Sequence, residues 1–76
     1  MANKAEELIK SAKIGDVIRY IPTVGEVKGY EILQLSSKFE PGFKCYKHDE
    51  NCIVHVSNRK IREKINKLQL VGGSNG

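Results

Sequence analysis

Four residues of the types that bind zinc lie close together in the middle of the chain, in the pattern Cys45-x-x-His48-x-x-x-Cys52-x-x-His55. Thiolate and imidazole groups are the ligands of structural zinc sites, which usually take them in pairs from tight turns. Here Cys45 and His48 fall in one strand-like run and should point to opposite faces of it, because successive strand residues alternate sides. We therefore expect buried, apolar cysteines, solvent-exposed histidines and no bound metal or other cofactor, with zinc as the less favoured alternative.

The sequence contains no pattern typical of an enzyme. A Cys–His pair could supply a nucleophile and a base, but Cys45 should point inward and no Gly-rich turn that could form an oxyanion hole follows either cysteine. Gly25 and Gly29 lack the companion residues of a phosphate-binding loop. We therefore predict that the protein is not an enzyme and has no catalytic residues.

The excess positive charge is concentrated near the carboxyl terminus. The chain has a formal net charge of +4, and the balance of residues 57–71 alone accounts for it: Arg59, Lys60, Arg62, Lys64 and Lys67 against Glu63. On a helix, Lys60, Lys64 and Lys67 would form one ridge that could contact phosphates. A lysine-rich polar face is also common on helices that are merely solvated, so both interpretations stay open.

Residues 43–48 and 52–57 are two strand-like runs with hairpin spacing. With Glu50 and Asn51 as a two-residue turn, one face is apolar and the other carries polar and aromatic side chains: Phe43, Cys45, Val54 and Val56 against Lys44, Tyr46, His48, His55 and Ser57. This register places Tyr46 opposite His55 and separates the two cysteines by roughly 13 Å. We expect Lys44, Tyr46 and His55 to form a nucleic-acid-binding surface on which a base stacks, or else an ordinary cross-strand cluster.

The other elements follow from apolar periodicity and from turn residues. We predict a helix over 3–13, strands over 17–21 and 27–35, and a loop over 36–42. From Asn58 we predict a helix to about Leu68, or a shorter helical turn followed by a strand over 67–71. Residues 1–71 should form a single domain and 72–76 a flexible tail. This order is typical of a β-rich α+β fold, a small SH3-like five-stranded barrel with a short N-terminal helix and a basic helical segment near the C-terminus.

The composition of the sequence indicates the cellular location and the class of function. No export signal or membrane-spanning stretch is visible, so we expect a cytoplasmic protein with reduced cysteines and no membrane partner. The sequence favours a small non-catalytic binding domain for nucleic acid. The alternative is a protein–protein interaction module, an adaptor or inhibitor, that docks through an exposed edge strand such as residues 27–35. Because so small a core is only marginally stable, a homodimer is as compatible with the sequence as a monomer.

Overall fold

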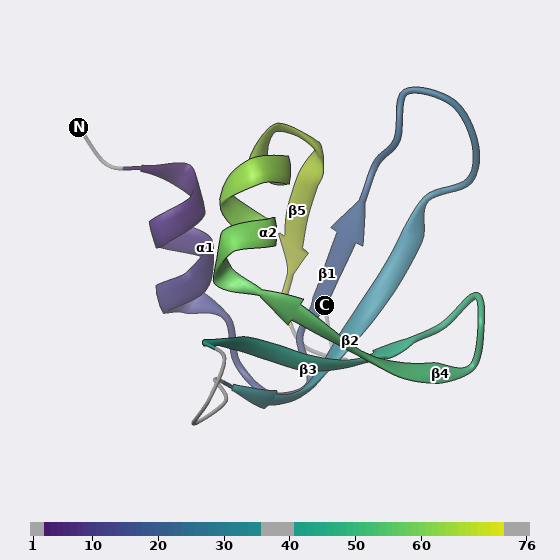
Figure 1. The fold of residues 1–76 in the computed structure, drawn as a ribbon, viewed down its shortest axis with the longest axis horizontal. Helices are drawn as coiled ribbons and strands as arrows, with labels where there is room; N and C mark the ends of the chain where they lie inside the picture. The colour runs from purple at the N-terminus through teal and green to yellow at the C-terminus, as the bar shows by residue number, and fades with distance from the viewer. Residues whose placement is uncertain (1–2, 36–40, 73–76) are drawn as a thin grey trace.

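The computed structural model describes residues 3–35 and 41–72. Five strands form one antiparallel sheet in the order β4-β3-β2-β1-β5. Figure 1 shows both helices side by side on one face of this bent sheet. The predicted small α+β architecture with five strands is confirmed. The elements are α1 (Lys4–Ser11), β1 (Val17–Tyr20), β2 (Lys28–Leu35), β3 (Gly42–Lys47), β4 (Cys52–Ser57), α2 (Asn58–Lys64), the 3-10 helix η1 (Ile65–Lys67) and β5 (Leu68–Val71).

Two predicted segments fall largely on residues that are not described. Of the loop predicted over 36–42, residues 36–40 lie outside the described ranges, and so do residues 73–76 of the predicted tail. Among the described residues, no helix has the length and apolar character needed to cross a membrane.

α1 begins where the sequence predicts. The Asn3 side chain accepts a hydrogen bond from the Ala5 backbone N–H at 2.9 Å, which satisfies one of the unpaired donors of the first turn. Ala5 and Leu8 are the buried residues of this helix and face the core. α1 therefore covers one end of the sheet with a narrow apolar stripe.

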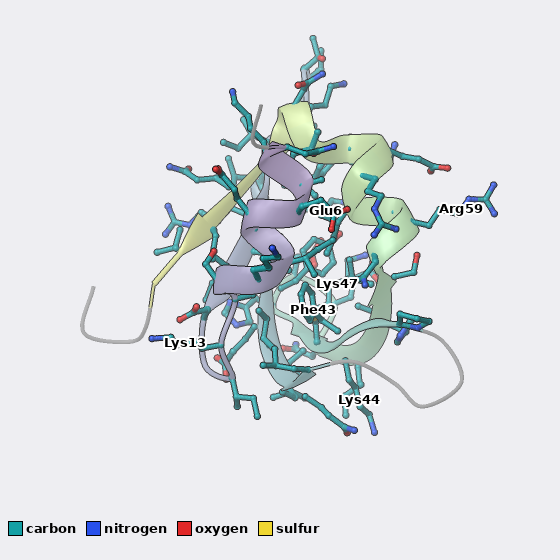
Figure 2. The ribbon with its side chains drawn as sticks, turned by 90° about the vertical axis from the view of Figure 1, so that its left-hand side faces the viewer. Glu6, Lys13, Phe43, Lys44, Lys47 and Arg59 are labelled. Carbon is teal, nitrogen blue, oxygen red and sulfur yellow. The ribbon has the colours of Figure 1, made fainter. Side chains whose placement is uncertain are left out.

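The core lies between the sheet and the two helices. Its fully buried large side chains are Ile18, Ile32, Cys45 and Ile61, so β1, β2, β3 and α2 each contribute one. Phe43 is 3% exposed and joins this cluster. Figure 2 shows Phe43 pointing into the interior and its neighbour Lys44 pointing away from it, as strand alternation requires. The predicted core face of β3 and β4 is confirmed.

The register of the β3–β4 hairpin differs from the prediction by two residues. Cys52 pairs with Lys47, so the connection is four residues long rather than two, and Asn51 within it has a positive φ of 51°. A shift of two residues leaves every side chain on its predicted face, so burial could not have distinguished the two registers. Tyr46 consequently lies opposite Ile53 and not His55.

The segment after β4 follows the second of the two predicted alternatives. α2 ends at Lys64, η1 follows, and Leu68–Val71 pairs antiparallel with β1. The N-cap is Ser57 rather than Asn58, because the Ser57 hydroxyl accepts from the Lys60 backbone N–H at 3.1 Å. Because it ends at Lys64, α2 has only seven residues, and Ile61 is the one that is buried.

The predicted docking edge is wrong. β2 covers most of residues 27–35 and lies inside the sheet, paired with β1 on one side and β3 on the other. The sheet edges are β4 and β5.

An ion pair joins the two helices. Arg62 Nε on α2 donates to Glu6 Oε1 on α1 at 2.7 Å. Figure 2 shows Glu6 on the side of α1 that faces α2. The hydrogen bond from Arg62 lowers the pKa of the Glu6 carboxyl below its usual value.

We expect this pair to make stability depend on acid pH. A carboxyl whose pKa is lower in the folded state stabilises the fold above its unfolded pKa and loses that effect as the pH falls through the folded value. Glu6→Gln should therefore lower the melting temperature at neutral pH, and its difference from wild type should shrink below about pH 4.5. Thermal melts of both proteins from neutral to acid pH measure this. Glu7→Gln, the same change one residue along α1, is the matched control, and a Glu6→Gln effect that did not depend on pH would contradict the assignment.

Candidate functional site

A groove opens on the helix-bearing face of the sheet, between α2 and the ends of the strands. We call it the α2 groove. It has a volume of about 240 Å³. Apolar side chains from three strands form its floor, and lysines and tyrosines contribute polar groups: Ile18, Val54, Val56 and Leu68 with Lys47, Lys60, Lys64, Tyr20 and Tyr30. Each of these residues lies on the core face of its strand or on the neighbouring side of α2.

Lys60 and Lys64 are one helical turn apart on α2 and line the same side of the groove. Both are exposed, and within residues 3–35 and 41–72 neither forms an ion pair. Lys47 differs, because its Nζ lies 2.8 Å from Glu50 Oε1. That contact raises the pKa of Lys47 and lowers the pKa of Glu50. A bound anion would therefore meet Lys60 and Lys64 first, since Lys47 already has a carboxylate partner.

Two tyrosine rings lie beside these lysines. Lys64 Nζ is 5.9 Å from the centre of the Tyr20 ring, and Lys47 Nζ is 6.0 Å from the centre of the Tyr30 ring. Both distances are within the range of a cation–π contact. Partial burial raises the pKa of the Tyr30 hydroxyl, so it stays protonated and can donate a hydrogen bond. The groove thus combines aromatic faces, phenolic donors and ammonium groups around an apolar floor.

The aromatic surface predicted on the hairpin lies on the opposite face of the sheet. Lys44 and Tyr46 alternate with the buried Phe43 and Cys45, so their side chains point away from α2. The Tyr46 hydroxyl donates to Asn51 Oδ1 at 2.8 Å, and its ring centre is 5.7 Å from that of His48. Tyr46 is therefore engaged with the hairpin turn, which favours a structural role.

The predicted basic residues separate into three groups. Lys60 and Lys64 line the α2 groove. His55 on β4 also borders the groove, and its cross-strand partner is Lys44. Arg59 and Arg62 are ion-paired, with Glu63 and Glu6 respectively. Lys67 is exposed on η1 and does not line the groove, because the helix ends at Lys64. The ridge predicted from Lys60 to Lys67 is therefore interrupted after Lys64.

The Cys/His pattern is spread over both faces of the hairpin. Cys45 is fully buried, and burial raises the pKa of its thiol to about 11. Cys52 pairs with Lys47 and Cys45 with Val54, so the two cysteines are diagonal neighbours, roughly 7–8 Å apart rather than the predicted 13 Å. Both are free thiols. His48 Nε2 lies 3.5 Å from Glu31 Oε1 on the other face, and the described part of the chain contains no cluster of three or more metal-ligating side chains.

Tyr20 and Tyr30 were not among the residues that the sequence singled out. A signal was nevertheless present, because each lies two positions from a strongly apolar residue, Ile18 or Ile32, and shares its strand face. A tyrosine on the core face near a strand end places its ring at the margin of the core. What the sequence could not show is that the basic helix packs against that same margin.

Comparison with known proteins finds no matching family model, no similar curated protein and no similar solved structure. The function must therefore be inferred from the chemistry of the α2 groove itself.

Proposed function

We propose that this domain binds single-stranded nucleic acid in the α2 groove. The supporting observation is that Lys60 and Lys64 line the same groove as Tyr20 and Tyr30. Single-strand binders combine cations along the backbone path with aromatic rings on which bases stack. In this proposal Lys60 and Lys64 contact phosphates, a base stacks on Tyr20, the ring beside Lys64, and no chemical reaction is catalysed.

The size and composition of the groove favour a base over a folded partner. A volume of about 240 Å³ is close to the lower limit for small-molecule pockets, so it suits one planar ring rather than a bulky ligand. The apolar floor matches the face of a base, and the phenolic donors match its carbonyl oxygens. A duplex would keep its bases stacked and out of reach, so a single strand is the form that fits.

Removing Lys60 and Lys64, which have no carboxylate partner among the described residues, tests the proposal. Binding to single strands should weaken with salt, with a slope of log K against log salt of about −1.4 for two phosphate contacts. K60A/K64A should weaken binding about tenfold or more at low salt and bring the slope close to zero. Fluorescence anisotropy with a labelled oligonucleotide over a range of salt concentrations measures both effects.

K10A/K13A is the matched control, because both lysines are exposed near the end of α1 and the loss of charge is the same. This variant should retain most of the affinity. Equal weakening by both double variants would indicate attraction by net charge alone and would contradict a site in the groove. Stronger binding of an acidic peptide than of an oligonucleotide would reassign the groove to a protein ligand.

The five-stranded sheet curves (Figure 1), and this bears on the type of fold. We propose that the sheet is a partly open SH3-like barrel. Its support is the pairing of the first and last strands, β1 with β5, together with the irregularity at Ile32/Gln34 where β2 can bend. A cytoplasmic location is part of the proposal too, and it fits the two free thiols.

A further inference from the structure

The β4 edge of the sheet lacks the usual protections against pairing with another strand. Its sequence, CIVHVS, contains no lysine, arginine, acid, proline or glycine. Its pairing with β3 is regular over all six residues, from Gly42↔Ser57 to Lys47↔Cys52, with no bulge. Edge strands normally carry charges, prolines or bulges that discourage further pairing. The other edge, β5, is protected by its short length of four residues.

β4 is also complementary to itself. In an antiparallel pair of two β4 strands, residues opposite each other must point to the same face. A twofold axis through Val54 meets this condition, because it places Val54 opposite its own copy, Cys52 opposite Val56, and Ile53 opposite His55. On the core face, the contact between the two β4 strands then consists of apolar residues only. An axis through His55 would instead oppose two imidazoles and place Ile53 against Ser57, which gives fewer apolar cross-strand contacts.

We propose that two copies of this protein associate through antiparallel pairing of their β4 strands, centred on Val54. A second β4 is the partner that fits best, since the edge has no charged side chain that would select a charged foreign strand. A second β4 strand also places an apolar residue opposite each of Cys52, Val54 and Val56. Ile53, which is 57% exposed in the single chain, becomes covered across from His55.

The interface is small. Six residues a side fall well short of the ~800 Å² per partner of a standard interface, so the dimer should be weak and depend on concentration. Sedimentation velocity of the wild-type protein should show a monomer–dimer equilibrium between micromolar and millimolar concentration. A chain that stays monomeric up to millimolar concentration would overturn the proposal.

The register is tested with charge pairs at exposed positions of β4. I53K/H55K places introduced ammonium groups opposite each other and should weaken dimerisation at least tenfold. I53K/H55E places each introduced ammonium group opposite an introduced carboxylate and should restore the wild-type affinity or improve on it. V24K/V27K adds two charges at exposed valines of the β1–β2 connection and should have little effect. Equal weakening by the two β4 variants would overturn the proposed register.

A disulfide provides an independent readout. Val54→Cys should form an intermolecular disulfide across the twofold axis under mild oxidation, because directly opposed strand residues have the Cα separation that a disulfide needs. His55→Cys should cross-link more slowly, since it lies opposite Ile53, and the reverse ranking would overturn the Val54-centred register. All of these measurements are made without nucleic acid, so they stand or fall separately from the proposed function.

Discussion

Replacing Tyr20 by leucine should reduce binding of single-stranded nucleic acid by about 5- to 150-fold. This range corresponds to the loss of one base–aromatic stack, worth roughly 1–3 kcal/mol. Leucine keeps an apolar side chain beside Ile18 and Leu68 in the groove, so the change removes the ring with little disturbance of packing. Tyr20→Phe keeps the ring and should retain most of the affinity. The measurement is oligonucleotide titration followed by fluorescence anisotropy, with the fold of each variant checked by an amide NMR spectrum.

Tyr46→Leu is the control that separates the two faces of the sheet. Tyr46 and Tyr20 are both half-buried strand tyrosines, but Tyr46 lies on the face away from α2. If binding occurs in the α2 groove, Tyr46→Leu should change the affinity less than about twofold. The opposite result, with Tyr46→Leu weakening binding and Tyr20→Leu not, would place the nucleic acid on the Lys44, Tyr46 and His55 surface and contradict the groove.

Residue alternation and capping explain how much of the fold the sequence could predict. Asn3 identified the start of α1, and the faces of β3 and β4 followed from the positions of Phe43 and Val56. The hairpin register could not be obtained in this way, because a shift of two residues preserves every face. It depends on the conformation of Asn51, whose positive φ belongs to a four-residue connection.

The carboxyl-terminal segment shows a second limit. Ile61, Ile65 and Leu68 fit one side of a longer helix as well as they fit a short helix that leads into a strand. Pairing of Leu68–Val71 with Val17–Tyr20, which lies 48 to 54 positions earlier in the chain, decides between them. Such non-local pairing leaves little local signal in a sequence.

Only part of the candidate site could be predicted, because it too combines residues that are distant in the sequence. The basic residues Lys60 and Lys64 stood out by charge, and both line the groove. Their aromatic neighbours were missed because Tyr20 and Tyr30 precede the first residue of α2, Asn58, by at least 28 positions in the chain. The packing of Ile61 into the core, against the sheet, brings these lysines and tyrosines together.

Gly42 packs closely against the end of β4 that leads into α2, and Gly42→Ala should be destabilising. It lies opposite Ser57, the residue that caps α2. A methyl group at this position would clash with the Val56 carbonyl oxygen and lie 2.7 Å from the Ser57 Cα. Both are backbone atoms, so β4 would have to move away from β3. Overpacking of this kind costs about 1–3 kcal/mol, and each kcal/mol lowers the melting temperature of a domain of this size by roughly 4–8 °C.

Gly29→Ala is the matched control, because it makes the same change within β2. Its added methyl group would lie 3.5 Å from His48 Nδ1 and 3.5 Å from Val17 Cγ1, which is ordinary van der Waals contact. Loss of glycine flexibility in the unfolded chain should make this variant neutral or slightly stabilising. Thermal unfolding followed by circular dichroism compares the two. Equal melting temperatures would show that β4 and α2 can shift at little cost, and the lysines of α2 would then not be held rigidly beside Tyr20.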